Sequence, residues 1–210
     1  ELGLRWAGLL HDAGKPHRRA VGADGRIRFW GHELVSLEIA QTIFQRLKAP
    51  KALVARVQAL IRHHGLHPDE TWSLGACRRL LARLAEAELP LADWATFRRA
   101  DRWAKGGDVA QEDARHVAML ARLEALAREA PVLNVTQLAL DGRALMALAD
   151  RPGGPWLGAL QRHLLDWVLE DPTRNEPKAL AEAARDWLAR EGGGAPEGPP
   201  LEPPNPPPVP

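Results

Sequence analysis

Several histidines and carboxylates in the first half of the chain are of the types that bind divalent metal ions. His11 and Asp12 form a doublet at the end of an apolar stretch. Further histidines follow about twenty residues later, at His32, and about fifty residues later, at His63-His64. Neutral imidazole and carboxylate suit such ions, and the set contains no thiolate. The sequence therefore predicts the metal site of a hydrolase, with the ion open among Ni, Mn, Zn, Fe and Mg.

The spacing also suggests which of these residues bind the ion and which act in catalysis. His11 and Asp12 are adjacent, so on a helix they project about 100° apart and can bind one ion from two sides. Lys15 follows the helix end and lies within reach of a phosphate on that ion, so we assign Lys15 and Asp12 to catalysis. Asp101 is an acid in an otherwise amphipathic helix and is a further oxygen ligand candidate. The predicted metal ligands are His11, Asp12, His32, His63, His64 and Asp101. Each histidine alone is more simply a surface or capping residue, but the combination favours a site.

Helices must position these residues. Ala, Leu, Arg and Glu dominate, Tyr is absent, and such a composition favours helix over strand. Apolar periodicity predicts a helix from Leu2 that ends at Gly14 and Pro16, then helices over about 32–48, 50–64, 74–87, 92–105 and 109–129. Residues 21–30 are expected to form a loop. The histidines then lie at three helix ends that can meet in one pocket, and the predicted fold class is all-α.

A smaller helical unit is expected after Pro131. Asp141 is a candidate N-cap for a helix over 143–148, and further helices are predicted over about 156–169 and 177–190. From Gly192 onward Pro and Gly dominate, and such a composition does not build a core. The predicted division is a first bundle over residues 1–130, a helical arm over 131–191 and a disordered tail over 192–210.

Composition excludes some function classes. The net charge is only +1, so nucleic-acid binding would need a local patch. A single cysteine, Cys77, excludes a disulfide framework and favours the cytoplasm. No apolar run reaches about 18 residues, so we expect no membrane span. The candidate RNA-binding patch consists of arginines on two predicted helices: Arg78, Arg79, Arg83, Arg98, Arg99 and Arg102. The simpler interpretation is that these arginines form a solvated helix face.

Four segments carry a resemblance to a known superfamily. They are His11-Asp12-Ala13-Gly14-Lys15-Pro16, Phe29-Trp30-Gly31-His32-Glu33, Ile61-Arg62-His63-His64 and Arg99-Ala100-Asp101. Together they resemble the HD-domain metal-dependent phosphohydrolases, and within them the bacterial tRNA nucleotidyltransferase/poly(A) polymerase family. Segments 140–146, 152–158 and 171–175 are similar to the C-terminal part of CCA-adding enzymes. The resemblance covers roughly residues 2–190 and aligns His64 rather than His63 with the family's histidine.

The resemblance implies an HD domain followed by a tRNA-binding arm. It implies hydrolysis of 2′,3′-cyclic phosphates and nucleotide 2′-phosphates, with RNA 3′ ends and nucleotide phosphoesters as partners. The family's nucleotidyltransferase head and an upstream histidine would precede Glu1, so nucleotide addition is expected only in a full-length parent. Whether that parent adds CCA, CC or A stays open, as does the oligomeric state. The alternative is a catalytically silent HD fold that acts as a spacer and RNA-binding body.

Overall fold

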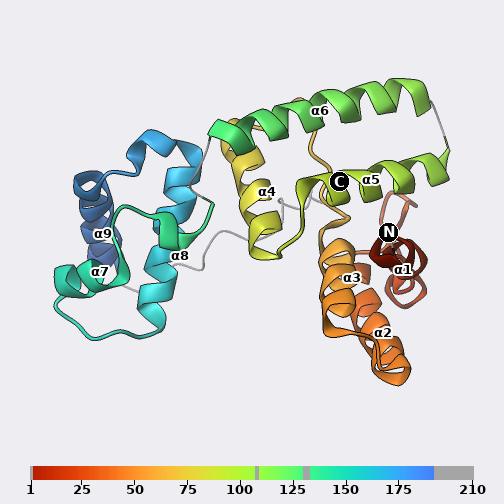
Figure 1. Ribbon diagram of the computed structural model, residues 1–210, viewed down its shortest axis with the longest axis horizontal. Helices are drawn as coiled ribbons and strands as arrows, with labels where there is room; N and C mark the ends of the chain where they lie inside the picture. The colour runs from red at the N-terminus through yellow and green to blue at the C-terminus, as the bar shows by residue number, and fades with distance from the viewer. Residues whose placement is uncertain (1, 107–108, 130–132, 192–210) are drawn as a thin grey trace. The chain divides into compact units, whose positions relative to one another are not determined.

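The computed structural model describes residues 2–106, 109–129 and 133–191, and within them the chain is all-α, which confirms the predicted fold class (Figure 1). The tail over 192–210 lies outside the described residues, so its disorder stays a prediction. No helix in the described part of the chain is long and apolar enough to cross a membrane. The described residues divide into two compact units.

The first unit contains residues 2–71 and 84–122. Its helices are α1 (Leu2–Leu10), α2 (His32–Leu47), α3 (Lys51–His63), α5 (Leu91–Lys105) and the first part of α6 (Val109–Glu129). The α1 helix packs against α3, α3 packs against α2, and the Trp6 and Phe44 rings meet edge to face with their centroids 5.3 Å apart. These contacts bring the C-terminal ends of α1 and α3 close to the N-terminal end of α2.

The segment between α1 and α2 contains more structure than the predicted loop. A short 3-10 helix, η1 (Lys15–Arg18), leads into an antiparallel hairpin of β1 (Ala20–Val21) and β2 (Ile27–Arg28). The Asp24 carboxylate accepts a hydrogen bond from the Arg26 backbone N–H, and Gly25 has a φ of 72° that glycine adopts without strain. The turn residues thus fold the segment back on itself, and two-residue strands are too short for periodicity to reveal.

Among the described residues, the second unit contains residues 72–83, 123–129 and 133–191. Its helices are α4 (Leu74–Glu86) up to Arg83, the end of α6, α7 (Gly142–Ala149), α8 (Pro155–Glu170) and α9 (Pro177–Glu191), with the short 3-10 helices η2 (Val135–Gln137) and η3 (Pro172–Arg174). The Asp141 carboxylate caps α7 by accepting a hydrogen bond from the Ala144 N–H, as predicted. Leu145, Leu160, Leu164 and Leu180 form the centre of its core.

The two compact units are bounded differently from the predicted domains, whose boundary near residue 130 stays a prediction. Most of α4 belongs to the second unit because its arginines bond to the C-terminal end of α8. Arg78 Nη1 donates to the carbonyl oxygens of Leu169 and Glu170, and Arg79 forms an ion pair with the Glu170 carboxylate. These partners lie more than ninety residues apart in sequence, so helical periodicity contains no information about them.

Candidate metal centre

The centre forms where the ends of α1, α2 and α3 meet α5, and Gly14 makes that meeting possible. A Cβ atom on Gly14 would lie 2.2 Å from the His32 carbonyl oxygen and 2.8 Å from the Ser36 nitrogen. The buried Ser36 hydroxyl accepts a hydrogen bond from the Gly14 N–H at 2.9 Å and donates to the His11 carbonyl at 2.7 Å. Gly14 and Ser36 therefore lock the end of α1 to the first turn of α2.

Five of the predicted ligands converge in this place. His11 Nε2 lies 3.2 Å from Asp12 Oδ2 and 3.2 Å from Asp101 Oδ1. His32 Nε2 lies 3.2 Å from both Asp12 Oδ1 and His64 Nε2, and His64 Nε2 lies 3.9 Å from Asp12 Oδ1. Asp101, 90 residues from His11 in sequence, thus belongs to the same cluster. His64, and not the neighbouring His63, supplies the ring that faces His32 and Asp12.

Backbone carbonyls set the same tautomer in all three histidines. His11 Nδ1 bonds to the Gly8 oxygen at 3.0 Å, His32 Nδ1 to the Phe29 oxygen at 2.8 Å, and His64 Nδ1 to the Ile61 oxygen at 2.7 Å. A carbonyl oxygen only accepts hydrogen bonds, so each Nδ1 carries the proton. In the neutral ring each Nε2 then presents a lone pair to the cluster. Carbonyl partners of this kind orient metal-binding histidines.

These lone pairs face other electron-rich atoms. His32 Nε2 and His64 Nε2 are 3.2 Å apart, and His11 Nε2 faces two carboxylate oxygens. Such an arrangement is repulsive unless a cation lies among the atoms. His11, Asp12 and His64 each offer a ligand atom, and these atoms lie within 4.8 Å of one another. The donor set of imidazole nitrogens and carboxylate oxygens therefore fits a divalent metal ion.

The surrounding charges keep the ligands in their metal-binding protonation states. Burial works to raise the pKa of Asp12, but the 2.6 Å hydrogen bond from Lys15 Nζ and the nearby His11 lower it on balance. Burial also works to raise the pKa of Asp101. The hydrogen bond from Lys105, whose Nζ lies 2.6 Å from Asp101 Oδ2, outweighs it, so the pKa of Asp101 is lowered. Burial lowers the pKa of His64. The carboxylates are thus ionised and His64 neutral near pH 7.

A buried arginine holds the end of α3 that carries His64. Arg98 is only 4% exposed, and its Nη1 donates to the His64 carbonyl at 2.9 Å and to His67 Nδ1 at 2.6 Å. Burial and the neighbouring Arg98 lower the pKa of His67 to about 4, so His67 accepts this bond as a neutral ring. On the same helix, α5, Trp94 Nε1 donates a hydrogen bond to the His63 carbonyl at 2.9 Å. Arg98 and Trp94 thereby fix the last turn of α3 on α5.

The predicted arginine patch needs correction. Arg98 is buried, so its assignment to RNA binding is wrong. The remaining five fall in different units, with Arg78, Arg79 and Arg83 in the second and Arg99 and Arg102 in the first. Arg99 forms two hydrogen bonds with the Asp113 carboxylate, at 2.6 and 2.7 Å. RNA contacts by these five arginines stay a prediction.

Sequence reasoning did not single out Ser36, Lys105 or the positioning role of Arg98. Ser36 could have been noticed, because it follows His32 by four residues and therefore shares its helix face. Lys105 follows Asp101 by the same interval. The contact of Arg98 with α3 had no such local signal, because its partners lie more than thirty residues away.

Comparison with known proteins agrees with this geometry. Residues 1–104 match the family model of the HD domain. The chain is 37% identical over 193 residues to the A-adding tRNA nucleotidyltransferase of Deinococcus radiodurans, a match that covers 90% of this chain and 41% of that protein. It is 33% identical over 202 residues to the CC-adding tRNA nucleotidyltransferase of Thermus thermophilus, covering 94% of this chain and 44% of that one.

No solved structure gives a significant match. The chain spans less than half the length of the two relatives it resembles. It is therefore an HD-domain protein that is homologous, over most of its own length, to tRNA nucleotidyltransferases.

Proposed function

We propose that the centre is a divalent-metal-dependent phosphohydrolase site that acts on 2′,3′-cyclic phosphates and 2′-phosphates of nucleotides and RNA ends. The observation that carries the proposal is the convergence of three oriented Nε2 atoms with the carboxylates of Asp12 and Asp101. The HD domain matched over residues 1–104 supports a metal-dependent hydrolase. A divalent ion in such a site supplies a more acidic bound water and polarises a phosphoryl oxygen.

The residues of the chain then have distinct tasks. His11, Asp12 and Asp101 hold the ion, together with His32 and His64, whose Nε2 atoms face Asp12 in the same cluster. Lys15 lies 2.6 Å from Asp12 Oδ2 and its side chain is 32% exposed, so its ammonium group borders the centre and is accessible to a substrate. There it can stabilise the negative charge that develops on a phosphoryl group during hydrolysis.

The larger protein would act on tRNA. The two relatives are named for adding A or CC to tRNA, and this chain covers 41% and 44% of them. We infer that nucleotide addition belongs to a nucleotidyltransferase domain outside this chain. The second unit and the five remaining arginines of the predicted patch would contribute to tRNA binding, and the protein would work in the cytoplasm. The competing function is that of a catalytically silent HD fold, which acts as a structural spacer and binds RNA.

Metal binding by matched variants tests the proposal. The adjacent residues His63 and His64 allow an internal control, because the His64 ring faces His32 and Asp12 in the cluster. Calorimetric titration of the metal-stripped protein with Ni²⁺, Mn²⁺ and Zn²⁺ should show a tight site in the wild type and in His63→Ala. His64→Ala should bind at least about ten-fold more weakly, since one coordinating nitrogen is gone. A wild-type protein that binds none of the ions would favour the spacer function.

A further inference from the structure

The segment between Asp12 and His32 is rich in positively charged residues, most of which have no role in the proposed hydrolysis. Residues 15–30, which we call the basic hairpin, comprise η1, β1, β2 and the turn between the strands. They contain five lysine and arginine residues and only one acid, Asp24, whereas the whole chain has a net charge of +1. Positive charge is thus concentrated in the segment beside the metal centre.

Both ends of the basic hairpin are anchored on residues of the centre. At its start, Lys15 pairs with Asp12 and lies over the Phe29 ring, 5.6 Å from the ring centroid. At its end, the Phe29 carbonyl accepts hydrogen bonds from both the backbone nitrogen and Nδ1 of His32. A strand rises about 3.3 Å per residue, so Arg26, three residues before Phe29, lies within about 10 Å of Phe29 along the chain. The basic hairpin is therefore fixed next to the reacting position.

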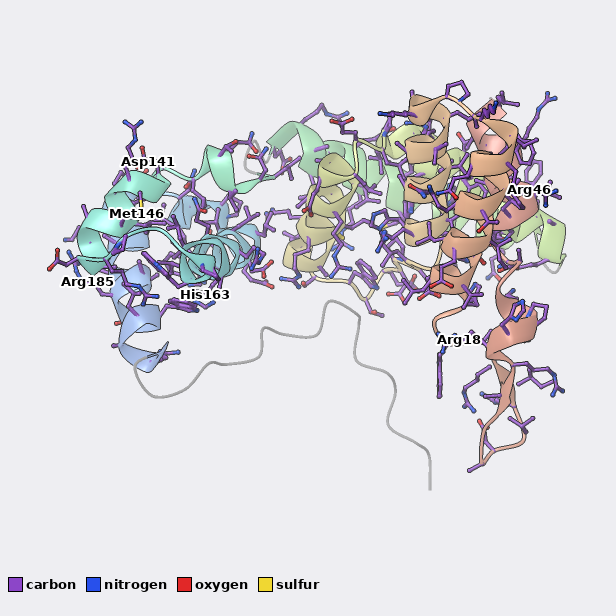
Figure 2. All side chains as sticks on the ribbon, turned by 90° about the horizontal axis from the view of Figure 1, so that it is seen from below. Arg18, Arg46, Asp141, Met146, His163 and Arg185 are labelled. Atoms are coloured by element: carbon purple, nitrogen blue, oxygen red, sulfur yellow. The ribbon has the colours of Figure 1, made fainter. Side chains whose placement is uncertain are left out.

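Its accessible surface mixes cations with an aromatic ring. Arg18, Arg19 and Arg26 are exposed, and the Trp30 ring is 57% exposed although tryptophan is usually well buried. Arg28 lies over Trp30 at 5.5 Å from its centroid and also binds both oxygens of Asp24. Those bonds neutralise the one acid and hold the turn. Figure 2 shows the hairpin extending away from the helices of the first unit, with Arg18 near its base.

We propose that the basic hairpin is the docking surface for single-stranded RNA whose terminal phosphoester enters the metal centre. This inference rests on the proposed hydrolase function and names its substrate class, an oligonucleotide rather than a free mononucleotide. Arginines beside the centre meet the next phosphates along the strand, and Trp30 offers a face on which a base can stack. Cationic side chains interleaved with aromatic rings are how proteins hold single strands without reading their sequence.

Positive charge alone would attract any polyanion. The exposed Trp30 ring favours a nucleic acid over other polyanions. Arg28 lies over the Trp30 ring, and the ring is still 57% exposed, so it offers an apolar face on which a nucleobase can stack. The fixed anchoring on Lys15 and Phe29 also places the surface where the end of a strand must pass. A mononucleotide at the centre would not reach Arg26 or the turn, so the basic hairpin distinguishes long substrates from short ones.

Two hairpin variants and a charge-matched control test the proposal. The variants are Arg18→Ala/Arg19→Ala and Trp30→Ala, and the control is Arg46→Ala/Lys51→Ala, two exposed cations of the same unit. Arg46 lies fourteen residues after His32 on α2, about 21 Å along the helix. Each protein is assayed with a short RNA that ends in a 2′,3′-cyclic phosphate and with the corresponding cyclic mononucleotide. RNA binding is also followed by fluorescence anisotropy at several salt concentrations.

The hairpin variants should raise KM for the RNA at least about five-fold and leave the mononucleotide unchanged. The double arginine variant should reduce the salt slope of RNA binding by about 1.4, since each single-strand phosphate contact contributes about 0.7. The control should match the wild type in both. Wild-type RNA affinity in the hairpin variants, or an equal loss in the control, would overturn the inference. Absence of hydrolysis in the wild type would instead refute the proposed function, because anisotropy still reports on docking.

Discussion

At the scale of single residues, the centre depends on atoms that orient ligands as much as on the ligands. His11, His32 and His64 all direct Nε2 inward because their Nδ1 atoms are bound to backbone carbonyls three residues earlier. Each of these carbonyls belongs to the chain immediately before its histidine, so the local backbone conformation prepares the ligand. The pair of Gly14 and Ser36 then joins two of the helix ends.

Replacing Gly14 with Ala should disturb this joint. The added Cβ would lie 2.2 Å from the His32 carbonyl oxygen, so the first turn of α2 must move. We expect a loss of about 1–3 kcal/mol in the free energy of unfolding and weaker metal binding. Gly8→Ala is the matched control, because a Cβ at Gly8 has nothing within 4 Å and a helix interior favours Ala by up to about 1 kcal/mol. Urea denaturation checks both; a Gly14→Ala protein as stable as Gly8→Ala would contradict the tight joint.

The histidines also predict how stability depends on pH. Burial is the main cause that lowers the pKa of His64 and of His67, the latter to about 4. Below about pH 6.5 the unfolded chain therefore binds protons at these positions that the folded chain does not, and at His67 this range extends down to about pH 4. The stability of the metal-free protein should fall as pH falls through this range. In urea titrations at several pH values His67→Gln should lose less stability on acidification; a slope identical to that of the wild type would contradict it.

At the scale of elements, long-range hydrogen bonds place the helix ends. Arg98 on α5 holds the His64 carbonyl at the end of α3. Arg98→Met should lower the free energy of unfolding by about 1–3 kcal/mol, because the freed carbonyl is left without its donor, and should weaken metal binding. Arg99→Ala is the neighbouring control, since its ion pair with Asp113 is solvent-exposed and such pairs contribute little to stability. If the two variants were equally stable and bound metal equally, Arg98 would have no positioning role.

Sequence periodicity predicted where the helices begin and end better than it predicted which side chains they bury or pair. Prolines and glycines bracket the helices, so α2, α3, α5 and α6 begin and end within a few residues of expectation. The burial of Arg98 and the attachment of Arg78 to α8 depend on partners far away in sequence. The ligand cluster was predictable because its residue types are rare and chemically specific. The choice of His64 over His63 came from resemblance, and the ring contacts of His64 agree with it.

At the level of the whole molecule, we expect phosphoester hydrolysis and nucleotide addition to be separate chemistries. Under the proposed function, the HD centre and the site of nucleotide addition would lie in separate domains of a full-length protein. Asp12→Ala in that protein should abolish phosphohydrolase activity while nucleotide addition to tRNA stays within about two-fold of the wild type. Parallel assays with labelled nucleotide and with a cyclic phosphate check this. Loss of both activities in a folded variant would show that the centres are coupled.

Hydrolysis of a 2′,3′-cyclic nucleotide by metal-stripped and metal-reloaded protein shows whether the HD centre is a metal-dependent phosphohydrolase. The stripped protein should be inactive, and at least one of Ni²⁺, Mn²⁺, Zn²⁺, Fe²⁺ and Mg²⁺ should restore hydrolysis in the wild type and in His63→Ala. Asp12→Ala and His64→Ala, which alter two side chains of the cluster 3.9 Å apart, should stay at least about a hundred-fold less active with the same ion. A protein that binds the ions tightly yet hydrolyses no cyclic or 2′-phosphate would contradict the account.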